Sequence, residues 1–192
     1  TIDQCIGGAR DIRALVTDIS YLDPQEGIRF RGKTISETFE MLPKAEGSNY
    51  PTVEAFWFFL LTGEVPNEEQ LEAVMLEFKA RQHVPHYVFE IIRAMPIDTH
   101  PMTMLSTGIL AMQKDSVFHE FYSSGQFNKN TAWEYVYEDA FDIVARIPVL
   151  AAYIYNLKYR DNKQIEINRK LDMGANFAHM IGQSKEYEDV AR

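Results

Sequence analysis

Apolar residues recur at helical spacing along most of the chain, and this pattern predicts a mainly α-helical protein. The segment 53–62 is the most apolar of these helices, and Gly63 after it suits a left-handed C-terminal cap. Another helix is predicted after Asn67, whose side chain can cap it, while Gln70 can return a hydrogen bond. Shorter helical patterns are expected at about 36–42, 86–95 and 171–182.

The helix predicted to start at Pro101 has a shallow surface. Proline suits the first helical position, with Thr99 or His100 just outside the helix. Gly108 in mid-helix costs about 1 kcal/mol relative to alanine, and close packing of another helix would offset that cost. The large apolar residues of this helix form one stripe, and small residues lie between them: Met102, Leu105, Ile109 and Met112, with Ser106 and Ala111.

A long helix is predicted over about 132–160. Its apolar residues fall into two sets on different sides, so we expect it to be buried on more than one face. Pro148 is expected to kink this helix rather than end it, because the apolar pattern resumes at once. The first set is Trp133, Tyr137, Ala140, Val144, Ile147, Ala151 and Ile154, and the second is Val136, Phe141, Ala145, Val149, Ala152 and Tyr155.

The N-terminal region is the one place where β structure is predicted. Two short extended pieces flank a turn that Asp23, Pro24 and Gly27 favour. We therefore expect residues 1–35 to form an N-terminal segment with a small hairpin, and residues 36–192 to form the helical part.

Composition narrows the class of protein. The 192 residues can bury a substantial core as one large or two small domains. The net charge of −9, with both signs interspersed, argues against a nucleic-acid-binding surface, which needs a basic patch. The apolar run 53–61 falls far short of the roughly 20 residues that span a bilayer, so no membrane span is predicted. Cys5 is the single cysteine, which excludes an internal disulfide, and the start at Thr1 suggests a processed or truncated chain.

The histidines are candidates for catalysis or metal binding. His100 lacks a Cys, Ser or acidic partner close in sequence, so we expect it to be a local hydrogen-bonding group at a helix start rather than a catalyst. His83 and His86 resemble a metal pair, but zinc requires two more ligands, and Pro85 between them indicates a turn.

Two arginines near the predicted hairpin could bind an anion. Arg29 and Arg31 would share one face of a strand, where side chains repeat every two residues. Such a pair can clamp a carboxylate or phosphate, but we favour ion pairs with the nearby Asp23 and Glu26.

Two further groups have weaker signals. Arg10 follows two glycines, and flexible backbone beside a guanidinium can receive a phosphate, although a plain surface turn is the simpler interpretation. Glu134, Glu138 and Asp139 could do acid–base work, but we favour a solvated helix N-terminus, where the helix dipole stabilises acidic side chains.

Five segments, in order and with short gaps, resemble citrate synthase, especially the form found in eukaryotic mitochondria. The likeness covers nearly the entire chain, with the segments LDPQEGIRFRGKTI, FWFFLLTGEVPNEEQ, THPMTML, WEYVYEDAFDIVARIPVLAAYIY and KLDMGANFAHMIG. The resemblance implies an almost wholly helical fold and a homodimer. It also implies that helices at about 101–114 and 132–159 lie at the subunit interface, with His100 at the start of an interface helix.

The resemblance further implies the condensation of acetyl-CoA with oxaloacetate in the mitochondrial matrix, a reaction of the tricarboxylic acid cycle, without a metal or other cofactor. The family's catalytic aspartate and histidines lie on later segments. We therefore expect this chain to be the N-terminal portion, without catalytic residues and inactive by itself.

Two residues gain a role from the resemblance. Arg10 matches a family arginine that contributes to CoA phosphate binding. Lys129 stands near the position of a second basic residue, in a segment one residue longer than the family's, and a lysine cannot make the two-pronged contact of an arginine. Two alternatives to a citrate synthase remain open: a catalytically silent structural or filament-forming relative, and a 2-methylcitrate synthase.

Overall fold

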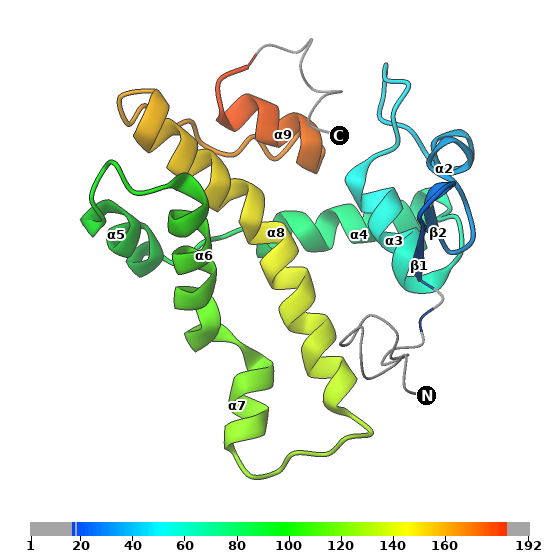
Figure 1. Ribbon diagram of the computed structural model, residues 1–192, viewed down its shortest axis with the longest axis horizontal. Coiled ribbons are helices and arrows are strands. Elements are labelled where there is room, and N and C mark those ends of the chain that lie inside the picture. Colours follow the sequence, from blue (N-terminus) through cyan, green and yellow to red (C-terminus); the bar gives the residue numbers. More distant parts are fainter. Residues whose placement is uncertain (1–16, 18, 184–192) are drawn as a thin grey trace, which may run out of the picture.

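The chain folds mainly into helices, with one small antiparallel hairpin (Figure 1). The computed structural model describes residue 17 and residues 19–183. In chain order the elements are β1 (Ser20–Asp23), β2 (Gly27–Phe30), α2 (Ile35–Met41), α3 (Val53–Thr62), α4 (Glu68–Arg81), α5 (His86–Ala94), α6 (Pro101–Ala111), the 3₁₀ helix η2 (Met112–Asp115), α7 (Val117–Ser123), α8 (Ala132–Tyr159) and α9 (Met173–Met180).

The long helix α8 crosses the molecule and organises the other helices around it. In Figure 1, α6 and α7 lie along one side of α8, α9 packs near its C-terminal half, and α4 leads away to α3 and the hairpin. The helix continues through Pro148, as the sequence predicts. This arrangement buries α8 on more than one face, which agrees with its two apolar sets.

The predicted hairpin is confirmed, and its register is set by the turn. Ser20 pairs with Phe30, and Asp23 pairs with Gly27. Gly27 takes a φ of 91°, a left-handed conformation that costs glycine little. The Asp23 carboxylate accepts the backbone N–H groups of the two turn residues that follow Pro24, at 2.8 and 2.9 Å.

Local signals correctly placed the starts and ends of several helices. Asn67 and Gln70 form the expected capping box at the start of α4. Gly63 ends α3 with a φ of 79°. The last helix is shorter than predicted: it begins after Asp172, whose carboxylate accepts the N–H of Ala175, and it ends at Met180.

Helix α7 was not predicted, because much of what stabilises its N-terminus comes from another helix. Ser116 supplies an ordinary cap by accepting the N–H of His119. Asp139 on α8 accepts the N–H groups of Val117 and Phe118 at 2.9 and 3.3 Å. A carboxylate at this end is favourable for the helix dipole, but no local pattern reveals a partner so distant in the sequence.

The main core lies where α5, α6 and α8 meet. Met104 and Leu150 have no exposed surface, and five other apolar residues complete the cluster: Val84, Val88, Ile92, Met112 and Ile154. A Cβ atom added at Gly108 would lie only 2.7 Å from Leu150 Cδ2. The expectation that Gly108 permits close helix packing is therefore confirmed.

Helix α8 is also long and apolar enough to cross a membrane by length and mean hydropathy alone. The run 53–61, the most apolar of the sequence, forms the shorter helix α3. In this fold α8 packs against α4, α6, α7 and α9, contains the buried Asn156, and pairs Arg146 with Asp142 at 2.9 Å. These features are typical of the central helix of a helical core.

Candidate functional site

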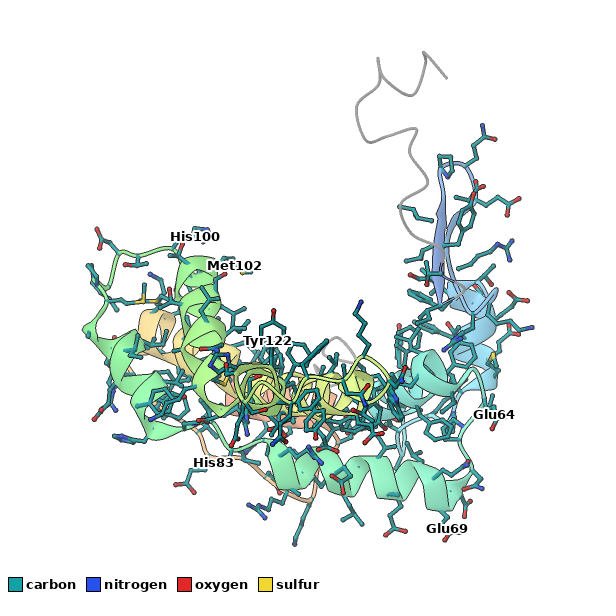
Figure 2. All side chains as sticks on the ribbon, turned by 90° about the horizontal axis from the view of Figure 1, so that it is seen from below. Glu64, Glu69, His83, His100, Met102 and Tyr122 are labelled. Carbon is teal, nitrogen blue, oxygen red and sulfur yellow. The ribbon has the colours of Figure 1, made fainter. Side chains whose placement is uncertain are left out.

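The most extensive candidate site is a surface rather than a cleft. We call it the α6–α8 surface and define it by five exposed apolar residues: Met102, Leu110, Trp133, Val136 and Ile143. Leu110 is 74% exposed and Trp133 is 63% exposed, which is unusual for such large apolar side chains. Figure 2 shows Met102 and Tyr122 on one face of the molecule, with His83 and Glu69 on the opposite face.

Polar contacts fix the start of α6 against α8. His100 Nδ1 accepts the N–H of Met102 at 3.2 Å, so its predicted role as a local hydrogen-bonding group is confirmed. The Lys158 ammonium donates to the carbonyls of Ile97 and Thr99, both at 2.6 Å. These contacts give α6 a fixed position from which to present its exposed residues.

A hollow of about 250 Å³ lies beside this surface, between η2, the end of α6 and α8. Leu110 and Ile143 form its apolar wall, and Asp142 and Arg146 line another part. Arg146 donates to Asp142, while its Nε is buried without a hydrogen-bond partner in the described part of the chain. The hollow thus combines an apolar wall with the Arg146–Asp142 ion pair.

The acidic residues at the start of α8 do not form a catalytic pair. Glu138 is 2.6 Å from the Arg81 guanidinium, and Asp139 caps α7. The prediction of a solvated helix N-terminus therefore needs correction, because these two carboxylates bind neighbouring elements. Each has a separate structural partner, so neither is positioned with the other for acid–base chemistry.

The arginines of the hairpin region also serve different structures. Arg29 pairs with Glu26 at 2.9 Å, as expected. Arg31 lies beyond β2 with a φ of 49°, and its guanidinium donates to the carbonyls of Leu60 and Leu61 at the end of α3. The prediction that the two arginines share a strand face is wrong, because the left-handed backbone at Arg31 ends the strand.

Of the two histidines considered as a metal pair, His83 and His86, the second lies near Glu90, with 3.5 Å between His86 Nδ1 and Glu90 Oε1. Within residues 17 and 19–183, no group of three or more His, Cys, Asp or Glu side chains is placed to hold a metal ion.

Glu54 is a buried acid that sequence reasoning missed. It is only 2% exposed, and its Oε1 accepts the N–H of Met173, the first residue of α9, at 2.9 Å. Burial raises the pKa of Glu54, the Asp172 carboxylate adds to the rise, and the Lys79 ammonium opposes it. The available signal was a lone carboxylate in the most apolar run of the chain.

Of the two residues expected to bind CoA phosphate, only Lys129 belongs to the described part of the chain. Arg10 lies outside the described residues. Lys129 is exposed on the loop between α7 and α8. Lys129 is not among the residues that line the hollow or define the α6–α8 surface.

Comparison with known proteins identifies the class to which this helical fold belongs. The family model described as "Citrate synthase, C-terminal domain" matches residues 8–192. The chain belongs to the citrate synthase family.

Individual relatives agree with this assignment. The chain is 43% identical over 182 residues to "Citrate synthase, mitochondrial" of Daucus carota, covering 95% of this chain and 38% of the carrot protein. It is 47% identical over 201 residues to "Probable citrate synthase, mitochondrial" of Leishmania major, covering 100% and 42%. The chain thus spans about two fifths of the length of these curated relatives.

A solved structure supports the fold. The crystal structure of citrate synthase from Pyrobaculum aerophilum matches with a TM-score of 0.78 and 24% sequence identity, covering 96% of this chain and 44% of that chain. The mainly helical fold class with a small hairpin is confirmed.

Proposed function

We propose that the full-length protein condenses acetyl-CoA with oxaloacetate to give citrate and CoA, without a metal or prosthetic cofactor. The observation that carries this proposal is the family match over residues 8–192 together with more than 40% identity to the carrot and Leishmania proteins.

In this proposal the present chain supplies scaffold and not the reacting groups. His100 accepts a hydrogen bond from the Met102 N–H at the start of α6. Glu138 pairs with Arg81 on α4, and Asp139 caps α7. The acid–base residues belong to other parts of the full-length protein, so residues 1–192 alone have no activity. The mitochondrial names of the relatives support a location in the mitochondrial matrix.

The α6–α8 surface is proposed to contact a second copy of the protein in a homodimer. Met102, Ser106 and Leu110 are spaced four residues apart and are all exposed, so they form one ridge along α6. A small residue between two large apolar ones suits the close approach of another helix. Burial of this ridge against a second subunit would remove its apolar side chains from water.

Lys129 and Arg10 are proposed to bind the phosphates of CoA. The exposed position of Lys129 on a loop leaves its ammonium accessible to an anionic ligand. A lysine contributes a point charge without the two-pronged geometry of arginine, so its contribution to affinity is modest.

The experiment is a measurement of free CoA released by the purified full-length protein from acetyl-CoA and oxaloacetate. We expect release that depends on both substrates, and a higher KM for acetyl-CoA with little change in kcat for Lys129→Ala. Lys163→Ala, a replacement at another exposed lysine, is the matched control. A correctly dimeric protein that releases no CoA would refute the enzyme proposal, and a preference for propionyl-CoA would favour a 2-methylcitrate synthase.

A further inference from the structure

The loop between α7 and α8 (Figure 1) is anchored by an aromatic ring directly before Lys129. Phe127 lies two residues before the lysine, and its ring contacts three rings of α7. These are Phe118, Phe121 and Tyr122, with ring centroids 6.3, 5.7 and 5.3 Å from that of Phe127. Aromatic pairs at such distances stabilise a structure beyond the area that they bury. The aromatic ring thus fastens the loop to α7.

The aromatic group that receives Phe127 is itself fixed to α8. Phe121 stacks on Tyr135 of α8, with centroids 4.1 Å apart, and Asp139 of α8 caps α7. Phe127 is 39% exposed and belongs to neither of the buried core clusters formed by the described residues. Removal of its ring should therefore loosen the loop without unfolding the two helices.

A β-turn fixes the backbone at Lys129 itself. The Asn128 carbonyl accepts the N–H of Thr131 at 3.2 Å and that of Ala132, the first residue of α8, at 2.9 Å. The Asn128 side-chain oxygen accepts the N–H of Asn130 at 3.0 Å, which is the hydrogen bond of an Asx turn. Lys129 and Asn130 are therefore the central residues of a turn that leads directly into α8.

We propose that Phe127 and Asn128 are positioning residues, which hold the backbone of Lys129 where its ammonium receives a phosphate of CoA. This inference rests on the CoA-binding role proposed for Lys129. A lysine side chain is a flexible point charge, so the backbone from which it extends is the part that the fold can fix in advance. Fixing that backbone lowers the cost of ordering the loop when the ligand binds, and this tightens binding. Neither positioning residue has to touch the ligand.

The test is the Kd for CoA, measured by isothermal titration calorimetry on the full-length protein, so that no turnover is needed. Lys129→Ala should raise the Kd by about 2–5-fold, the size of one exposed ion pair. Phe127→Ala should raise the Kd about twofold or more, without exceeding the effect of Lys129→Ala, because the loop must then be ordered on binding. In the Lys129→Ala background it should add nothing. Asn128→Ala keeps the aromatic group and should act in the same direction.

Two variants and a second readout separate positioning from a general loss of structure. Phe127→Tyr keeps the ring and should restore the Kd of the unmodified protein. Phe39→Ala is the matched control and should leave the Kd unchanged, because Phe39 is similarly exposed, at 41%, and pairs with Tyr50 far along the chain from this loop. In hydrogen exchange, the N–H groups of Asn130 and Thr131 should exchange faster in Phe127→Ala than in Phe127→Tyr.

The outcomes distinguish this inference from the proposed function. An unchanged Kd in Phe127→Ala, or a further rise in the Lys129→Ala background, would overturn the positioning role. An unchanged Kd in Lys129→Ala, or no binding of CoA at all, would overturn the CoA-binding role of the lysine and this inference together. A protein that shows the expected Kd values but releases no CoA from acetyl-CoA and oxaloacetate would refute the enzyme proposal alone.

Discussion

Gly108 and Leu150 offer a direct test of the packing between α6 and α8. A methyl group at position 108 would lie 2.7 Å from Leu150 Cδ2 and 3.2 Å from Cδ1, and Leu150 has no exposed surface into which it could move. Gly108→Ala gains about 1 kcal/mol from helix propensity. Overpacking a filled core typically costs about 1–3 kcal/mol. The net expectation is a loss of about 0–2 kcal/mol in the free energy of unfolding.

The sign should reverse when the obstructing side chain is removed. Leu150→Ala alone should cost about 2–5 kcal/mol, because it leaves a cavity in the core. In that background Gly108→Ala meets no obstruction, so it should stabilise the protein by about 1 kcal/mol. The two substitutions are therefore coupled, as expected for residues in direct contact.

The measurement is urea unfolding of the full-length protein and its three variants, with the slope of each transition checked for constancy. Thr103→Ala, at an exposed position of α6, is the control and should have the same small effect in both backgrounds. An equal effect of Gly108→Ala with and without Leu150 would refute the packing argument.

Three further substitutions test other contacts. Arg31→Lys should lower the free energy of unfolding by about 1 kcal/mol, because lysine lacks the rigid planar fork with which Nε and Nη2 of Arg31 both donate to the Leu60 carbonyl while Nη2 also reaches that of Leu61; an unchanged urea midpoint would contradict this. Asp139→Ala should cost about 1–2 kcal/mol through lost capping of α7, whereas Glu134→Ala, at an exposed acid in the first turn of the same helix, should cost only about 0.3–1 kcal/mol through the helix dipole; equal urea midpoints for the two would argue against the cap. Burial raises the folded pKa of Glu54, so its contribution to stability is present below the unfolded pKa of about 4.5 and is lost as pH rises through the folded pKa. Glu54→Gln should therefore flatten the dependence of thermal stability on pH above about pH 4.5, and an unaltered pH profile would contradict the raised pKa of Glu54.

The parts of the fold that sequence predicted are those set by neighbouring residues. The capping box of Asn67 and Gln70, the left-handed Gly63 and the first-turn Pro101 each depend on interactions within a few residues. The long apolar pattern of α8 was equally clear, because 28 residues average out local exceptions.

The parts that sequence missed depend on distant contacts. Helix α7 depends on Asp139, and the role of Arg31 depends on the end of α3, which lies 29 and 30 residues further along the chain. The contact that Glu54 makes was missed for the same reason, since its partner Met173 is 119 residues away. The predicted roles of Arg10 and Lys129 in binding CoA phosphate stay predictions. Arg10 lies outside the described residues, and the helix packing does not test whether Lys129 binds an anion.

The cap of α7 has a consequence for how the protein is made. Asp139 is synthesised 22 residues after Val117, so the residues of α7 are made well before the carboxylate that caps this helix. Phe121 has the same dependence, because its ring stacks on Tyr135, with centroids 4.1 Å apart. Until translation has passed Tyr135 and Asp139, α7 therefore lacks both its stacking partner and its cap.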